Sequence, residues 1–433
     1  MKTLIFDGSP AGDLQATRIR TALLARLPDA ETVILREQRI GNCAGDFLCW
    51  VRSPGVCKTD DDNPLLAARV MQSDLLVYLT PVRFGGYSSC LKRIVDHQIQ
   101  NVLPFFTTIH GEIHHKPRYH RYPDLLALGW MPDPDAQSEA IFRHLVWRNA
   151  INMHARSSGC GVLVGTPDEA DLAAQIGLGL EALERFSDLQ APSLPRMAEA
   201  PAAGIPPRRA LLLVGSPRTK ASTSASLGGF LFEHLALRGV QTETLQVYPA
   251  FSSPERTARS LEKSDAADLV VLAFPLYVDS LPAPLIAALE KIAEYRAGRS
   301  SEQRFAAIAN CGFPEASHNA PALAICSEFA RQSGFTWAGG LALGGGQGIV
   351  HGMPLDALDG RALPIKKSLK MAAAALANGE SIPGAAGDLL ARPAVPSWLY
   401  LLFGAYGWRQ QAKRYGVQRQ IKNRPYEPVR AGR

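Results

Sequence analysis

A glycine followed by hydroxyl side chains and an arginine, in the second half of the chain, has the composition of an anion-binding loop. The segment runs Gly215-Ser-Pro-Arg-Thr-Lys-Ala-Ser-Thr-Ser224 and follows an apolar run typical of a buried strand. Where a strand passes into a helix, free backbone N–H groups and the helix dipole attract negative charge. The Gly-Lys-Ser/Thr ending of a Walker loop is absent. Taken alone, this segment fits a simple helix cap as well as it fits a phosphate site.

Two later segments place an aromatic ring and small polar residues where strands should end. Pro275-Leu-Tyr-Val-Asp-Ser280 closes one apolar run, and Asn310-Cys-Gly-Phe-Pro-Glu315 closes the next. The carboxyl ends of neighbouring parallel strands meet at one edge of a sheet, where such proteins bind ligands. An aromatic side chain and exposed backbone amides suit contact with a planar ring. The three segments together predict one crevice, with a phosphate at the first loop and a ring at the other two.

The elements that must position these loops occur twice along the chain. Lys2–Pro10 and Ala210–Arg218 both run from apolar residues into Gly-Ser-Pro, and Asp74–Pro81 matches Asp268–Pro275. In each member of the second pair the acid lies seven residues before the proline. Self-similarity of this kind indicates two related domains, each with a ligand crevice at its strand ends.

Strand and helix patterns alternate through both halves, which predicts parallel sheets covered by helices on both faces. The strands expected in the first half are Thr3–Asp7, Thr32–Leu35, Leu75–Thr80, Leu125–Trp130 and Gly161–Gly165. The strands expected in the second half are Ala210–Val214, Thr242–Val247, Leu269–Phe274, Phe305–Asn310 and Thr336–Leu343. The predicted fold class is therefore α/β, with two doubly wound sheets of five strands.

Changes in composition set the expected domain boundaries. With 433 residues the chain can bury two cores. Five prolines between residues 191 and 207 indicate an extended linker. We expect domains at 1–190 and 209–385, a linker at 191–208, and a C-terminal tail at 386–433.

The formal net charge of +6 is concentrated at the C-terminus, where residues 405–433 hold eight Lys/Arg and one acid. The rest of the chain is nearly neutral, so no nucleic-acid groove is expected. No apolar stretch reaches the roughly 20 residues that span a bilayer, and no signal-peptide pattern precedes the first strand. These features predict a cytoplasmic protein. The apolar run Trp398–Trp408 beside the basic residues could lie on an anionic membrane surface, but docking on its own protein is the more frequent outcome.

As an ordered set, these motifs resemble the flavodoxin-like, NADPH-dependent FMN reductases. The resemblance rests on Gly-Ser-Pro-Arg with its Ser/Thr cluster, on Pro-Leu-Tyr, on Gly-Phe-Pro-Glu, and in the first half on Pro81–Ser88. It implies two tandem flavodoxin-like domains with noncovalently bound FMN. By position, the phosphate would contact Ser216, Arg218, Ser222 and Ser224, and the ring would contact Pro275, Leu276, Tyr277, Val278, Asn310 and Gly312. The corresponding residues of the first half are Ser9, Pro81, Phe84, Gly85 and Gly86.

The resemblance also implies an activity. The protein would take hydride from NAD(P)H onto FMN and pass electrons to a small-molecule or protein acceptor. Because the flavin carries the chemistry, no catalytic triad or carboxylate pair is needed. Family members usually pair two such domains as a dimer, and tandem domains would supply that pairing within one chain. The alternative is a flavodoxin-like electron-transfer or partner-binding module that does not itself use NAD(P)H.

The first phosphate loop departs from the family pattern. It reads Gly8-Ser-Pro-Ala-Gly-Asp13, with alanine in place of the arginine and a carboxylate two residues later. A carboxylate repels a phosphate unless it points away, although Thr17 and Arg18 could compensate. We therefore expect the second half to hold the phosphate better, and whether one or two FMN bind stays open.

The first half also carries an insertion that contains Cys43, Asp46, Cys49 and Cys57. It resembles the cluster-binding segment of iron–sulfur flavoproteins, in which a cysteine stands at the position of the aspartate. Four thiolates are the usual requirement of a cubane cluster, and a carboxylate is a poor substitute. The sequence therefore favours a structural loop without a metal over an iron–sulfur cluster, and a zinc site is a minor alternative.

A polar segment of the first half, His110–Pro123, is rich in His, Arg and Tyr. Its glycine and proline predict a loop rather than a helix with paired histidines, which disfavours a metal site. The favoured interpretation is a cover over the crevice, where these side chains would meet a nicotinamide phosphate or an acidic acceptor.

Overall fold

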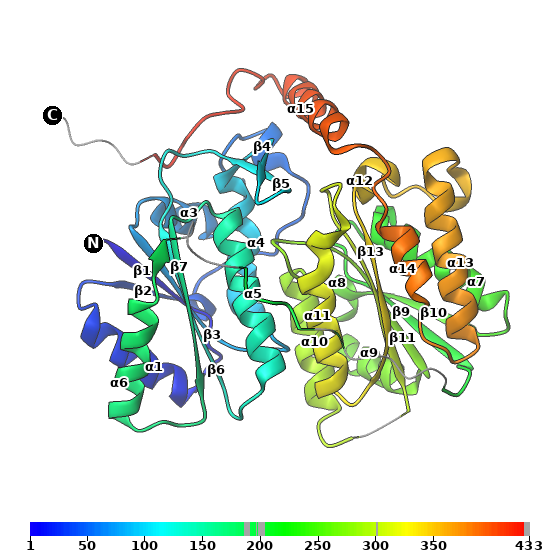
Figure 1. Ribbon diagram of the computed structural model, residues 1–433, viewed down its shortest axis with the longest axis horizontal. Helices are drawn as coiled ribbons and strands as arrows, with labels where there is room; N and C mark the ends of the chain where they lie inside the picture. The colour runs from blue at the N-terminus through cyan, green and yellow to red at the C-terminus, as the bar shows by residue number, and fades with distance from the viewer. Residues whose placement is uncertain (186–190, 196, 198–203, 300–301, 428–433) are drawn as a thin grey trace. The chain divides into compact units, whose positions relative to one another are not determined.

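The computed structural model divides into two compact units. One unit contains residues 1–194 and 398–433, and the other contains residues 195–397. Residues 398–427 thus pack with the first unit. The residues that the structure describes are 1–185, 191–195, 197, 204–299 and 302–427 (Figure 1). The expected linker lies partly outside them.

The first unit contains a sheet with the strand order β2-β1-β3-β6-β7-β8. Its strands are β1 (Thr3–Asp7), β2 (Glu31–Ile34), β3 (Leu75–Pro81), β6 (Asp124–Met131), β7 (Ser157–Val164) and β8 (Glu184–Arg185). The first five are parallel, and the short β8 runs antiparallel to β7. The helices of this unit are α1 (Leu14–Arg26), α2 (Leu48–Val51), α3 (Asn63–Met71), α4 (Ser89–His97), α5 (Ala136–Asn152), α6 (Glu169–Glu181) and α15 (Ser397–Arg414).

The second unit contains a five-stranded parallel sheet with the order β10-β9-β11-β12-β13. Its strands are β9 (Arg209–Val214), β10 (Gln241–Gln246), β11 (Leu269–Pro275), β12 (Arg304–Asn310) and β13 (Thr336–Leu343). Its helices are α7 (Thr223–Ala236), α8 (Val247–Ala250), α9 (Pro254–Ala266), α10 (Ala283–Tyr295), α11 (Ala320–Gln332), α12 (Gly346–Ile349), α13 (Leu363–Ala377) and α14 (Gly384–Ala391). Helices α7, α13 and α14 lie on one face of this sheet, and α10 and α11 lie on the other (Figure 1).

Alternation of side chains along the strands builds the core of each unit. In the second unit Leu212, Val271 and Ile308 point to the same face and pack against Leu231 of α7 and Leu369 of α13. The residues between them point to the other face, which is also covered, so the inner strands are apolar throughout. This two-sided burial explains why the central strands read as continuous apolar runs in the sequence.

The prediction of two doubly wound, five-stranded parallel sheets is confirmed, and β8 is an addition to the first. Most strands begin and end within two residues of the predicted positions. The exception is β7, which starts at Ser157 rather than Gly161. Its first residues are serine and glycine, which have low β-propensity, and pairing with β6 overrides that preference.

The acid that the sequence repeats has the same structural role in both units. The carboxylate of Asp74 accepts a hydrogen bond from the backbone amide of Lys2 at 2.7 Å. The carboxylate of Asp268 accepts from the amides of Arg208 and Arg209 at 2.7 and 2.8 Å. Each acid therefore joins the start of the third strand to the start of the first. The repeat at this point is structural and lies at the opposite end of the strands from the loops.

The structure corrects the prediction that the polar segment His110–Pro123 is a loop. Residues Val102–Ile109 (β4) and Glu112–Pro117 (β5) form an antiparallel hairpin. His110 and Gly111 form its two-residue turn, with φ angles of +49° and +83°. Two left-handed residues match the twist of a hairpin, so the glycine that indicated a loop marks a turn between strands.

The aromatic stretch near the C-terminus forms α15, and one side of this helix is docked on the first unit. Trp408 packs edge-on against Trp50 and Phe47, with ring centroids 5.1 and 5.4 Å apart. Gly404 lies against the ring of Phe106, where a Cβ would come within 2.6 Å. Docking of this stretch on its own protein is thus confirmed. Among the described residues, no helix is long and apolar enough to cross a membrane.

Candidate functional site

The first loop of the second unit joins β9 to α7 and contains the predicted phosphate residues. Ser216 is buried directly after the strand, and its hydroxyl accepts from the amide of Arg218 at 3.4 Å. The Arg218 side chain is exposed, and Thr219 adopts a left-handed φ of +50°. A non-glycine residue in that region is uncommon and costs energy. The loop thus presents an exposed cation five residues before α7 begins at Thr223.

Two of the predicted phosphate residues serve the loop itself. Ser222 caps α7, because its hydroxyl accepts from the amide of Ala225 at 3.1 Å and donates to the carbonyl of Thr219 at 2.7 Å. Ser224 is buried, and its hydroxyl accepts from the side-chain amide of Asn310 at 2.9 Å. The helix-cap interpretation therefore holds for Ser222 and Ser224, whose hydrogen bonds fix the loop. The anion-binding interpretation rests on Ser216 and Arg218, which precede the helix.

The second loop follows β11 and makes a tight turn at Tyr277–Ser280. The amides of Tyr277 and Ser280 donate to each other's carbonyls at 2.9 and 3.1 Å. Val278 and Asp279 between them have φ angles of +46° and +56°. A β-branched residue such as valine rarely adopts a positive φ, and backbone strain of this kind concentrates at ligand sites. The half-buried Leu276, Tyr277 and Val278 are accessible for contact with a planar molecule.

The carboxyl end of β12 is hydrogen-bonded to the other two predicted segments, at the end of β11 and at the start of α7. The carbonyl of Asn310 accepts from the amide of Leu276 at 2.7 Å, and its side-chain amide donates to Phe274 O at 2.8 Å and to Ser224. Register pairing places Asn310 directly beside Pro275. The structure therefore brings the three predicted segments together at one edge of the sheet, and Asn310 links them.

A glycine turn after β13 supports this third segment. A Cβ on Gly344 would lie 2.2 Å from the carbonyl oxygen of Pro314, so only glycine fits. The amides of Gly345 and Gly346 donate to Phe313 O and Cys311 O at 2.6 and 3.0 Å. The glycine run that follows β13 therefore allows close backbone packing and fixes the turn that contains Gly312.

The ring loop of the first unit has the same geometry as that of the second. The amides of Arg83 and Gly86 donate to each other's carbonyls at 2.9 and 2.7 Å, and Phe84 and Gly85 have φ angles of +55° and +77°. Phe84 and Gly85 at this turn are buried, whereas Val278 at the corresponding position of the second unit is half-buried. A Cβ on Gly85 would lie 2.6 Å from Cβ of Ile141 on α5, so protein already covers this turn.

The phosphate loop of the first unit is filled by its own side chains. Asp13 caps α1 by accepting from the amide of Ala16 at 2.9 Å, and its second oxygen accepts from the indole of Trp130 at 3.1 Å. Trp130 pairs with Pro81 as Asn310 pairs with Pro275. A carboxylate therefore lies at the helix N-terminus, where the family pattern expects a phosphate.

The expected compensation by Thr17 and Arg18 is not supported by the structure. The hydroxyl of Thr17 donates to the carbonyl of Asp13 at 3.2 Å, and the guanidinium of Arg18 donates to Pro167 O. Ser9 is buried and accepts from Arg36 Nη1 at 3.2 Å. The role of Trp130 was missed in the sequence, although aligning the two repeated prolines would have placed it opposite Asn310.

The cysteine insertion gathers thiols and an imidazole in the first unit. Burial raises the pKa of Cys43 to about 12, with a further increase from the charge of Asp96. Burial also raises the pKa of Cys49, with a further increase from the charge of Cys43. Burial also opposes ionisation of Cys57, but a hydrogen bond and charge from His97 outweigh it and lower the pKa of Cys57. The pKa of His97 is raised, because its bonds to Cys57 and to Gly41 O outweigh its burial. No motif in the sequence pointed to His97.

The candidate fourth ligand does not fit a cluster in this arrangement. Asp46 is exposed, and its carboxylate accepts from the amide of Leu48 at 3.0 Å. The buried Cys49 and the partly buried Cys57 belong to or pack against the apolar cluster under α15. We therefore derive no step through an iron–sulfur cluster, and the interpretation as a structural loop stays a prediction.

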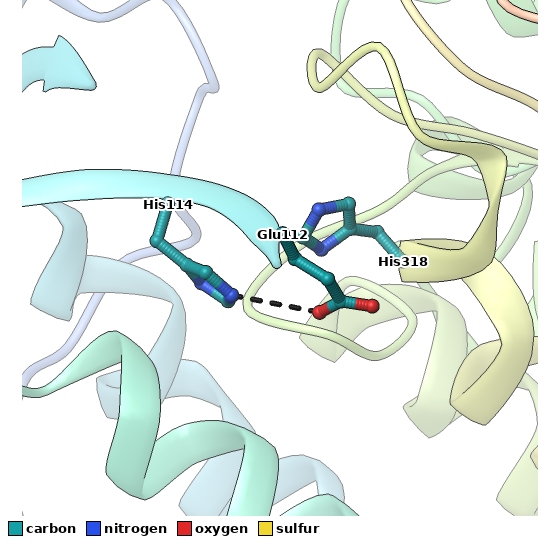
Figure 2. Close-up of side chains that lie close together, drawn as sticks. All are labelled: Glu112, His114 and His318. Carbon is teal, nitrogen blue, oxygen red and sulfur yellow. Dashed lines mark ion pairs between the residues drawn. The ribbon is translucent and has the colours of Figure 1, made fainter. Parts of the chain in front are cut away.

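Several side chains of the β4–β5 hairpin and of the segment after it are buried, while Lys116, His120 and Arg121 are exposed. Figure 2 shows Glu112 and His114 on β5, with Oε2 and Nε2 separated by 3.5 Å. Arg118 is buried and donates to the carbonyls of Val102 and Asn423 at 3.1 and 2.7 Å. Because Arg118 binds backbone carbonyls, it is not available to a nicotinamide phosphate. The predicted cover is wrong for this residue, whose role is to hold the C-terminal segment.

Comparisons with known proteins agree with the class of protein that the fold and the loops define, a flavodoxin-like flavoprotein. The family model described as NADPH-dependent FMN reductase matches residues 1–111 and 208–321. These matches cover more than half of the chain, so the chain belongs to this family. It is thus a general FMN-dependent oxidoreductase with two tandem copies of the family domain. A search of curated proteins found no significant match.

Several solved structures are similar to parts of the chain. An FMN-dependent NADH-azoreductase from Bacillus anthracis, in complex with FMN, is 15% identical over 40% of this chain and 100% of its own, with a TM-score of 0.31. An NAD(P)H:quinone oxidoreductase from Methanothermobacter marburgensis is 16% identical over 40% of this chain and 98% of its own, with a TM-score of 0.29. A flavodoxin from the domain Archaea is 10% identical over 39% and 96%, with a TM-score of 0.28.

Proposed function

We propose that the protein is an NAD(P)H-dependent oxidoreductase that binds one FMN per chain, in the second unit, and passes electrons to a small-molecule or protein acceptor. When bound, FMN would supply the redox chemistry. The chain's own residues would hold the phosphate at Ser216 and Arg218 and position the ring against Pro275–Val278, Asn310 and Gly312. The first unit would serve as a partner domain of the same fold.

The observation that carries this proposal is the contrast between the two phosphate loops. In the second unit an exposed arginine precedes the N-terminus of α7, and in the first unit a carboxylate caps α1. A cation attracts the phosphate dianion, whereas a carboxylate a few ångströms away repels it by several kcal/mol in a medium of intermediate dielectric. The same fold thus carries one loop that suits FMN and one that does not.

The ring loops differ in the same direction. The half-buried Leu276, Tyr277 and Val278 leave accessible surface at the turn of the second unit. In the first unit Phe84 is only 6% exposed, and Gly85 lies against Ile141. Both observations favour the second unit as the flavin domain.

A matched pair of variants tests the proposal. Arg218→Asp should weaken FMN binding by about tenfold or more, because it replaces a favourable charge with a repulsive one. Ala11→Asp makes the corresponding change in the first unit, at an exposed position, and should leave FMN content unchanged. Released FMN is counted per chain in both purified proteins. A wild type with two FMN per chain, or a loss in Ala11→Asp equal to that in Arg218→Asp, would contradict the assignment.

The alternative is an electron-transfer or partner-binding module that holds FMN without using NAD(P)H. Anaerobic mixing with NADPH or NADH separates the two functions. We expect bleaching of the flavin absorbance within seconds by at least one nucleotide. A flavin that stays oxidised with both nucleotides, yet is reduced by dithionite, would favour the module.

A further inference from the structure

Helix α15 has two faces, and only one of them is docked. Ala405, Trp408 and Ala412 belong to or pack against the apolar cluster that includes Trp50 and Phe105. At about 100° per residue these three positions fall on one side of the helix. The remaining side of α15 faces away from this cluster.

The second face of α15 carries large apolar side chains that remain exposed. Trp398, Leu402 and Phe403 are each 63% exposed, and Tyr406 is 62% exposed. By helical geometry these four positions fall within an arc of about 140°. Four large exposed apolar residues on one helix are uncommon on a protein surface and mark an interaction site.

Basic residues continue this face toward the end of the helix. Lys413 and Arg414 are exposed and lie within or next to the same arc. Arg409 is also exposed, but its guanidinium lies over the ring of Phe105 in the docked cluster, 5.1 Å from the ring centroid. Residues 398–427 contain six Lys/Arg and one acid, Glu427. The exposed face of α15 therefore combines aromatic side chains with positive charge.

A cavity in the same unit adds to this positive field. It has a volume of about 490 Å³ and lies between the cysteine insertion and the segment after α15. Its lining residues are Arg52, Ser53, Pro54, Val56, Lys58, Gln420, Asn423, Arg424 and Pro425. Three of the nine are cations and none is an acid, so the C-terminal region attracts anions at two places.

We propose that the exposed face of α15 binds the surface of an anionic phospholipid membrane. Trp and Tyr favour the headgroup level of a bilayer, Leu and Phe insert into the acyl boundary, and Lys and Arg pair with anionic lipids. An anionic membrane has an apolar interior beneath a negatively charged headgroup layer. The exposed face of α15 has apolar side chains followed by basic ones, so it can contact both. The helix would lie in the plane of the membrane, and this inference does not depend on the proposed function.

Vesicle co-sedimentation of the full-length protein tests the proposal. We expect binding to vesicles of phosphatidylcholine with about one third phosphatidylglycerol, and several-fold weaker binding to phosphatidylcholine alone. Added salt should weaken the binding, since surface charges are screened within about 10 Å at 0.1 M. Absence of binding to the anionic vesicles at low salt would overturn the proposal.

Matched variants assign the binding to this face. Leu402→Gln with Phe403→Ser should lower the vesicle partition coefficient about tenfold, because two partly inserted apolar side chains are lost. Leu14→Gln with Leu178→Gln removes two leucines of the same unit that are 79% and 65% exposed, and should leave the partition coefficient unchanged. Equal binding by the two double variants would place the site elsewhere and overturn the proposal.

Tryptophan fluorescence distinguishes lipid contact from protein contact. Anionic vesicles should shift the emission to shorter wavelength, and Trp398→Phe should abolish most of that shift while the protein still sediments with vesicles. A shift that appears on raising the protein concentration without lipid, together with a doubled mass in sedimentation velocity, would instead assign the face to a second copy of the chain.

Discussion

Asp13 and Ser222 occupy corresponding positions at helix N-termini, and the difference between them separates the two units chemically. Both accept hydrogen bonds from the helix amides, so both satisfy the same structural need. Asp13 adds a full negative charge and binds Trp130, whereas Ser222 stays neutral beside Arg218. The two caps therefore place different charges at corresponding positions of the same fold.

A prediction at the residue scale concerns the thiols of the insertion. Because His97 lowers the pKa of Cys57, a larger fraction of this thiol is ionised at neutral pH, and the thiolate is the reactive form. We expect Cys57 to be alkylated by iodoacetamide faster than Cys43, whose pKa is raised to about 12. Peptide mass spectrometry over a series of pH values measures both rates.

The variant His97→Asn should slow alkylation of Cys57 severalfold at pH 7 and move its rate profile to higher pH. Cys43 in the same sample is the internal control for general unfolding. If His97→Asn left the profile of Cys57 unchanged, the imidazole would not be what stabilises the thiolate.

At the scale of elements, the strained turn after β11 differs from the turn after β3. Both have two left-handed residues, but the first unit has glycine at the second position, where the second unit has Asp279. The second unit also keeps valine at the first position of the turn. Strain in a half-buried turn at a strand end is tolerated where the turn contacts a ligand, which agrees with flavin in this unit.

The corresponding prediction is that Val278→Gly stabilises the flavin-free protein by roughly 1 kcal/mol, because glycine adopts a positive φ without the steric cost. The same change should weaken FMN binding by removing a ring contact. Urea unfolding of the apoprotein and FMN titration measure the two effects.

Phe84→Gly is the matched change in the first unit and should destabilise that unit by about 2–4 kcal/mol, because Phe84 is buried and its packing is lost. If Val278→Gly instead destabilised the apoprotein, the turn after β11 would not be strained.

At the scale of the whole molecule, the C-terminal segment completes the first unit. Trp408 packs on Trp50, and Arg118 binds the carbonyls of Ile421 and Asn423 at 3.2 and 2.7 Å. Residues of the segment 405–421 therefore pack on a cluster of the first unit that includes Trp50 and Phe105. Tandem fusion allows this arrangement, because the chain returns to the first unit after completing the second.

Trp408→Ala should accordingly lower the free energy of unfolding of the first unit by about 2–3 kcal/mol. Trp398→Ala, which removes a tryptophan that is 63% exposed on the same helix, should change it by less than about 0.5 kcal/mol. Thermal unfolding monitored by circular dichroism compares the two variants. Equal effects would mean that α15 is not docked through Trp408.

The sequence by itself determined the fold class, and it predicted where a candidate site would lie. Apolar runs that end at Gly-Ser-Pro and at Pro275 locate the strands and their loops, because burial on both faces demands continuous apolar strands and loop formation demands glycine and proline. Repetition of these runs predicted two related sheets, and the ordered motifs predicted the family.

Only the tertiary structure decided which side chains contact one another at the strand ends of each unit. Trp130 reaches Asp13 across 117 positions of sequence, and Asn310 reaches Ser224 across 86, so no local pattern reveals either contact. The same applies to His97 beside Cys57 and to Arg118 beside the C-terminal segment. Local periodicity encodes elements, whereas the side-chain contacts at the two loops depend on which distant residues the sheet register brings together.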